Sequence, residues 1–180
     1  MSEKKSAWTD ADTEAMFATI GRYIVIFQWI EGKLDEILLL GWGHDDWEPS
    51  QVKLAKMTNS QKVKALGAIV SDSEEFARAR TRSDWMADFE RLIERLHAER
   101  ERRNSLAHSQ YLFEFAAAGE PPLRSLRQRG GDGAGFSQEW FSNSAQEKMM
   151  ADLSQLALDV NFTHVQLVHD YTASVRSRKR

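Results

Sequence analysis

The chain has 180 residues, of which 42% are hydrophobic and 28% charged, a composition typical of a soluble globular protein and too apolar for a disordered one. A formal net charge of −3 argues against coating nucleic acid by bulk electrostatics, and the lack of cysteine excludes disulfides, thiolate metal sites and cysteine nucleophiles. Residues 1–5 lack the apolar core of a secretory signal, and the most apolar run, 23–30, is too short to span a bilayer. We therefore expect one cytoplasmic domain over residues 1–180, without a membrane partner.

The first predicted helix begins near Thr9 or Asp10, both good N-caps, and runs to about Leu40, where Gly41 and Gly43 should end it. Its apolar residues recur three and four positions apart, as in a helix that packs on one face. They are Phe17, Ile20, Ile24, Phe27, Leu34 and Leu38.

A tryptophan-rich connector, 41–50, follows this helix. We then predict a short helix over 51–57, a longer one over 60–70 with Ser60 as its cap, and a polar loop over 71–83. The next helix, from 83 to about 109, is long and amphipathic.

Beyond this long helix the pattern changes to alternating and aromatic residues. Residues 111–115 suit a short strand, 123–129 a return strand, and 130–135 a glycine-rich loop. A last helix should cover about 144–174, ahead of a basic tail at 175–180. The predicted fold class is therefore all-α, a bundle of four or five helices with a hairpin-like insertion at about 110–140.

The apolar stripe of the long helix turns polar toward its C-terminal end. The stripe consists of Trp85, Phe89, Leu92, Ile93 and Leu96. Continued at about 100° per residue, it places Arg100, Arg103 and Ala107 near its centre and Asn104 and His108 along one edge. Because an unpaired buried charge costs several kcal/mol, arginines on a packing stripe indicate a purpose other than packing.

Glu31 lies on the stripe of the first helix and also needs a partner. Pairing with Arg100 or Arg103 would satisfy both charges. This ion pair has two interpretations. It either fixes the register of two packed helices, or it aims a guanidinium into a cleft shared with His108.

Arg103, Asn104 and His108 together suit RNA cleavage without a metal. An imidazole, with an unperturbed pKa of about 6.5, exchanges protons near neutral pH, and a guanidinium binds phosphate through two parallel hydrogen bonds. Asn104, four residues before His108, would orient the substrate or the imidazole. RNA supplies its own nucleophile, the 2′-hydroxyl, so neither a serine nor a cysteine is needed.

The sequence from Arg103 to His108 resembles the signature of HEPN-domain proteins, an arginine followed after four to six residues by a histidine. The resemblance covers roughly 10–110 and 140–175. It implies an α-helical bundle that dimerises and brings two motifs into one cleft, and many members are metal-independent endoribonucleases, often toxins or defence proteins. By position, Arg103 would hold the phosphate, Asn104 assist and His108 transfer protons.

The resemblance also implies partners. They are RNA, a second copy of the chain, and an antitoxin or a nucleotidyltransferase, with no cofactor or metal. We expect Arg102 and Tyr111 to contact RNA. Some members carry a tyrosine two residues after the histidine, which a nucleotidyltransferase modifies; here Gln110 takes that place and Tyr111 follows.

Other interpretations of the same residues stay open. The chain could be a non-catalytic HEPN-like module that binds a nucleotide, RNA or a partner protein, or a scaffold in which the polar cluster only fixes helix register. Glu94 and His97 form a Glu-x-x-His pattern, but a di-iron bundle needs a second copy, which the chain lacks.

Overall fold

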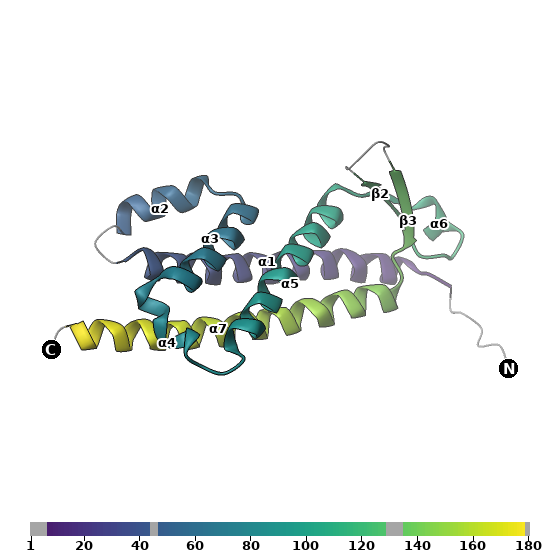
Figure 1. Cartoon of the computed structure of the whole chain (residues 1–180). Coiled ribbons are helices and arrows are strands. Elements are labelled where there is room, and N and C mark those ends of the chain that lie inside the picture. Colours follow the sequence, from purple (N-terminus) through teal and green to yellow (C-terminus); the bar gives the residue numbers. More distant parts are fainter. Residues whose placement is uncertain (1–6, 44–46, 129–134, 179–180) are drawn as a thin grey trace. The chain divides into compact units, whose positions relative to one another are not determined.

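The computed structural model describes residues 7–43, 47–128 and 135–178 (Figure 1). Within them the fold class is all-α, as the sequence predicts, with one small antiparallel sheet. The chain forms two compact units: unit 1 comprises the described parts of 1–25 and 102–153, and unit 2 those of 26–101 and 154–180. The single domain expected from the sequence stays a prediction. Residues 130–134 of the glycine-rich loop and 179–180 of the basic tail lie outside the described residues.

Helix α1 (Asp10–Trp42) begins where the sequence predicts and ends two residues later than predicted, because Gly41 is still helical and only Gly43 ends the helix. The backbone N–H of Thr9 donates to the Asp12 carboxylate, and the N–H of Asp12 donates to the Thr9 hydroxyl, so two helix-end donors are satisfied reciprocally. At the other end Gly43 adopts a positive φ of 93°, and its N–H donates to Leu40 O at 3.3 Å. A glycine accepts this left-handed conformation without strain.

One predicted core residue of α1 is wrong: Phe17 is 50% exposed, and its ring lies 5.8 Å from that of Phe113. The face that packs is rotated away from Phe17. Its buried residues are Met16, Tyr23, Phe27, Ile30, Leu34, Ile37 and Leu38.

Unit 2 contains the rest of α1, α2 (Trp47–Lys56) and α3 (Asn59–Asp72), and α2 begins earlier than predicted. The cap of α3 is Thr58 and not Ser60, because Thr58 and Gln61 form a complete capping box. A Cβ on Gly41 would lie 2.5 Å from the Ile69 side chain, so only glycine fits where α1 meets α3.

The predicted loop 71–83 is partly helical. It contains the 3-10 turn η2 (Glu74–Phe76) and the short helix α4 (Ala77–Arg80). Phe76 is fully buried, and the Arg80 guanidinium donates to Val70 O and Ser73 O at 3.0 and 2.8 Å. The buried Phe76 ring and the hydrogen bonds from Arg80 to the end of α3 stabilise this segment. Its sequence alone is too polar to predict a helix.

Unit 1 holds a three-stranded antiparallel sheet in the order β1-β2-β3, with β1 at Gln110–Leu112, β2 at Leu123–Gln128 and β3 at Gly135–Trp140. The predicted hairpin insertion therefore has a third strand. The strand predicted over 111–115 stops early, because α6 (Glu114–Ala117) follows it. Trp8 N–H donates to Gly119 O at 2.7 Å, which ties the start of the chain to this insertion.

Helices α5 (Trp85–His108) and α7 (Asn143–Arg178) each pass through both units. Within unit 2 the two are joined by side-chain contacts: the Trp85 indole N–H donates to Gln166 at 2.6 Å, and Arg95 pairs with Asp159 at 2.5 Å. No helix in the described parts of the chain is both long and apolar enough to cross a membrane.

Candidate functional site

The last turns of α5, in unit 1, carry the residues singled out by sequence. Arg103 and Asn104 are half-buried, Leu106 is buried and His108, the final helical residue, is exposed. In the described part of the chain, no residue makes a hydrogen bond or ion pair with the side chain of His108. Asn104 and His108 are four residues apart and so lie on the same side of the helix. The accessible imidazole of His108 is thus preceded, one turn earlier, by the half-buried side chains of Arg103 and Asn104.

The buried stripe of α5 follows a shorter period than the sequence analysis assumes. Its members at the C-terminal end are Glu99, 5% exposed, and Leu106, 3% exposed, whereas Ala107 is exposed. The positions 85, 89, 92, 96, 99 and 106 fit a 3.5-residue repeat, which drifts about 20° per heptad from the 3.6-residue extrapolation. The expected central position of Ala107 is therefore wrong, and the buried Glu99 was missed.

Glu31 and Arg100, expected to support the site, lie in unit 2 and have other partners there. The Glu31 carboxylate accepts hydrogen bonds from Gln28 and Asn59, each at 2.9 Å. Arg100 pairs with Glu101. The predicted Glu31–Arg100 pair is thus replaced, because the Asn59 amide at the start of α3 faces Glu31 and satisfies it without a second charge.

Arg102 and Tyr111, expected to contact RNA, are both engaged within unit 1. Arg102 pairs with Asp152 of α7 at 3.3 Å, with both side chains partly exposed. The Tyr111 hydroxyl donates to Leu106 O at 3.3 Å, and its ring meets Phe141 edge-on at 5.7 Å. Burial raises the pKa of Tyr111, although the nearby Arg124 cation opposes part of the rise, so the phenol stays a neutral donor.

Sequence analysis missed a charged side chain beside Tyr111. Arg124, in β2, has a side chain only 8% exposed; it pairs with Glu139 of β3 and lies over the Phe141 ring at 5.4 Å. Alternation along 123–129 could have marked 124 as facing one side of a sheet, but the pairing with β3 has no local signal.

No family model, curated protein or solved structure matches this chain. Any function therefore has to be argued from the chemistry of its own residues.

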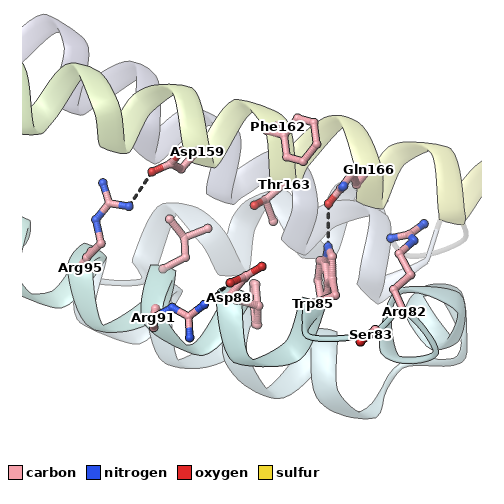
Figure 2. A pocket seen from close by; sticks show the side chains of 12 residues that line it. Arg82, Ser83, Trp85, Asp88, Arg91, Arg95, Asp159, Phe162, Thr163 and Gln166 are labelled. Atoms are coloured by element: carbon pink, nitrogen blue, oxygen red, sulfur yellow. Dashed lines mark hydrogen bonds and ion pairs between the residues drawn. The ribbon is translucent and has the colours of Figure 1, made fainter.

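A cavity of about 550 Å³ lies in unit 2 between the first turns of α5 and residues 159–166, in the middle of α7 (Figure 2). Trp85 and Phe89, stacked at 5.2 Å, and Leu92 form its buried apolar wall. Arg95 lines it from α5, and Phe162, 65% exposed, lines it from α7. The cavity is partly open to solvent, and aromatic and charged groups line it together.

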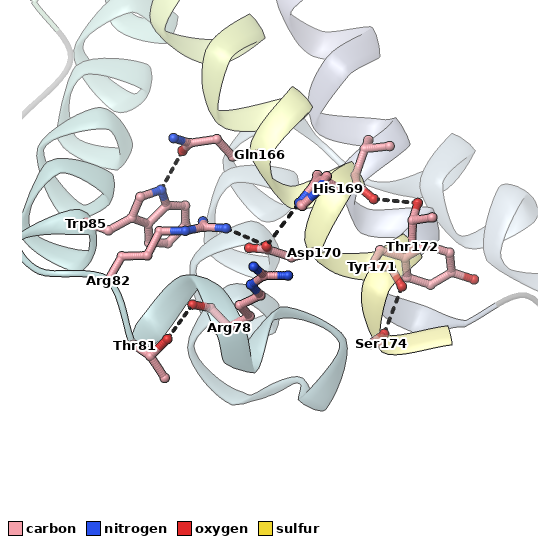
Figure 3. Close-up of polar contacts among 11 residues, drawn as sticks. Arg78, Thr81, Arg82, Trp85, Gln166, His169, Asp170, Tyr171, Thr172 and Ser174 are labelled. Atoms are coloured by element: carbon pink, nitrogen blue, oxygen red, sulfur yellow. Dashed lines mark hydrogen bonds and ion pairs between the residues drawn. The ribbon is translucent and has the colours of Figure 1, made fainter. Parts of the chain in front are cut away.

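The most deeply buried charge in unit 2 is Asp170, whose side chain is 0% exposed and pairs with Arg82 (Figure 3). The exposed imidazole of His169 lies 3.8 Å from the same carboxylate oxygen. In Figure 3 the Trp85–Gln166 bond lies beside this pair. Arg82, Asp170 and the Trp85–Gln166 bond together hold the start of α5 against α7, and we interpret them as structural.

Among the residues that the structure describes, no group of three or more histidines, aspartates or glutamates is arranged to hold a metal ion. Glu94 is exposed and His97 half-buried on α5. The end of α5 carries one imidazole, His108, and the guanidinium of Arg103.

Proposed function

We propose that the chain is a metal-independent endoribonuclease of HEPN type, with Arg103, Asn104 and His108 as its active-site residues. The observation that carries the proposal is the accessible, unengaged imidazole of His108 at the end of a helix that anchors Arg103 and Asn104 one turn earlier. A histidine with a structural role is usually buried and hydrogen-bonded. A histidine that exchanges protons with a substrate must be accessible to that substrate.

The proposed reaction is an internal transfer within RNA. One His108 imidazole accepts the proton of the 2′-hydroxyl, and the 2′-oxygen attacks the adjacent phosphorus. The P–O5′ bond breaks, and the 5′-oxygen leaves as a hydroxyl with a proton from the imidazolium of a second copy's His108. Arg103 holds the non-bridging phosphate oxygens, where negative charge is greatest in the transition state. The products are a 2′,3′-cyclic phosphate and a 5′-hydroxyl.

This reaction uses two imidazoles, which a homodimer would supply. An exposed apolar stripe on α7, in unit 2, supports association: Leu158, Phe162 and Val165 are 64%, 65% and 56% exposed and lie on one helix face. Contiguous exposed apolar residues mark interaction surfaces. In this proposal the protein acts in the cytoplasm, and an antitoxin or nucleotidyltransferase controls it.

The test compares purified wild type with Arg103→Ala and Arg103→Lys on a short RNA in the presence of a chelator. We expect cleavage by wild type, weak cleavage by the lysine variant and the least by the alanine variant. A single 2′-deoxy substitution at the cleaved position should block the wild type. Cleavage of the deoxy substrate, or equal rates for all three proteins, would refute the proposed mechanism.

A second candidate, a non-catalytic nucleotide-binding module, is favoured by the cavity in unit 2. Phe162, 65% exposed, could stack on a base, and Arg95 suits a phosphate, because its pairing with Asp159 is partly exposed and therefore weak. Calorimetry with ATP and with adenosine separates the candidates. Binding that Arg95→Met weakens and His108→Ala leaves unchanged, with RNA uncut, would favour the module over the enzyme.

A further inference from the structure

Three residues form a row across the sheet of unit 1. Tyr111 of β1 lies directly opposite Arg124 of β2, and Arg124 lies directly opposite Glu139 of β3. Directly opposite residues of antiparallel strands present their side chains on the same face. An ion pair between Arg124 and Glu139 links β2 to β3 within this row.

The other half of the row reaches the end of α5. Because α5 ends at His108, the last carbonyl groups of the helix have no helical N–H to accept from. The Tyr111 hydroxyl donates to one of them, Leu106 O, at 3.3 Å. Ser109 satisfies another, since its N–H donates to Ser105 O at 3.0 Å and its hydroxyl donates to the same oxygen. Residues just after the helix therefore fix the turn that carries the motif.

Arg124 is the least expected member of this row, because it is a charged side chain that is almost entirely buried. Its side chain is more than nine-tenths buried, and its Nε and Nη1 groups have no hydrogen-bond partner in the described structure. Burying a guanidinium with unsatisfied donors is costly, so a purely structural row would be expected to use an apolar residue here.

We propose that Tyr111 and Arg124 are positioning residues that hold the last turn of α5 and so orient Asn104 and His108. Tyr111 acts through its bond to Leu106 O, and Arg124 holds the Tyr111 strand in place from the neighbouring strand. The inference rests on the proposed ribonuclease function for its catalytic consequence. It replaces the RNA contact that the sequence suggests for Tyr111 with an internal contact.

The test uses Tyr111→Phe, which removes only the hydroxyl, with Tyr171→Phe of α7 as the matched control. A single net hydrogen bond corresponds to about a three- to tenfold change in an equilibrium. We expect amide hydrogen exchange in residues 106–110 to speed up by roughly that factor in Tyr111→Phe and not in the control. Exchange in the first turns of α5 should stay unchanged. This readout needs no RNA.

Kinetics then separate positioning from binding. For Tyr111→Phe we expect kcat to fall by about three- to tenfold with KM unchanged, because the hydroxyl orients the catalytic turn and touches no substrate. Arg124→Met should lower kcat further, with Arg124→Lys between the two. A raised KM with unchanged kcat would show that Tyr111 contacts RNA and would overturn the inference.

The two proposals fail in different ways. Unchanged exchange at 106–110 in Tyr111→Phe refutes the positioning role, whatever the cleavage assay shows. Faster exchange together with a wild type that cuts no RNA refutes the ribonuclease and supports the attachment of the turn by Tyr111. If Arg124→Met does not fold, Tyr111→Phe still decides the question.

Discussion

The two ends of α5 differ in how deeply their side chains are buried. Its first three turns, in unit 2, bury Trp85, Phe89, Leu92 and Leu96, each at most 8% exposed. Its last turn, in unit 1, buries only Leu106 and leaves Ala107 and His108 exposed. One continuous helix therefore has a well-packed end and an open end, and the proposed active site lies at the open end.

Within unit 2, two ion pairs differ in burial. Next to the packed end, Arg82 pairs with Asp170, whose side chain is entirely buried, while Arg91 and Asp88 form a pair that is about two-thirds exposed. A buried carboxylate that loses its cation is costly, whereas exposed pairs contribute little. The buried pair should therefore contribute much more to stability than the exposed pair.

The largest effect on stability is expected from Arg82→Met. This change leaves the Asp170 carboxylate buried without its cation, which should lower the free energy of unfolding by about 3–5 kcal/mol. Arg91→Met is the matched control and should cost less than about 1 kcal/mol. Urea unfolding followed by circular dichroism measures both. Equal losses for the two variants would remove the distinction between buried and exposed pairs.

A second comparison uses one substitution at each end of α5. Leu96→Ala empties a site that is 3% exposed and should destabilise the protein by about 2–5 kcal/mol. His108→Ala truncates an exposed side chain and should change stability by no more than about 0.5 kcal/mol. Thermal and urea unfolding give both values. A strongly destabilised His108→Ala would mean that the open end of α5 also serves packing.

The smallest expected effect is a pH dependence in unit 2. Burial, together with the Lys33 cation, lowers the pKa of His164. The Glu36 carboxylate, 2.7 Å from Nε2 of His164, opposes part of this shift. The unfolded chain then takes up this proton near pH 6.5 and the folded chain only at lower pH, so stability falls as pH drops below about 6.5. His164→Gln should flatten the dependence of urea midpoints between pH 7.5 and 5. Parallel curves for the two proteins would contradict this assignment.

The longer helices could be predicted to within about four residues because their signals are local, whereas the short elements η2, α4 and α6 were not predicted. The α5 boundaries, expected at 83 and 109, are 85 and 108, and the Thr9 cap and Gly43 end of α1 follow from neighbouring residues. Strand β3 pairs with β2, its neighbour in sequence, and the burial of Arg124 depends on that pairing. Residues 135–140 were not predicted as a strand because they contain only two apolar side chains, Phe136 and Trp140, too few for an alternating pattern.

The candidate site was predictable only in part. Spacing alone places Asn104 and His108 on one side of α5. The partners of Glu31 and the hydroxyl bond of Tyr111 depend on which elements lie opposite, which spacing cannot supply. The buried Glu99 was missed because a 3.6-residue period was extended over a stripe that repeats every 3.5 residues.

The most direct test of the central claim is the rate of RNA cleavage, with a chelator present, by wild type, His108→Ala and His169→Ala. His169 is the control because its side chain is also exposed, at 68%, and lies in the other unit. Removing a general acid–base should slow cleavage by roughly 10²–10⁴-fold, so we expect that loss for His108→Ala and wild-type rates for His169→Ala. Cleavage by His108→Ala at the wild-type rate would contradict a catalytic role for the end of α5.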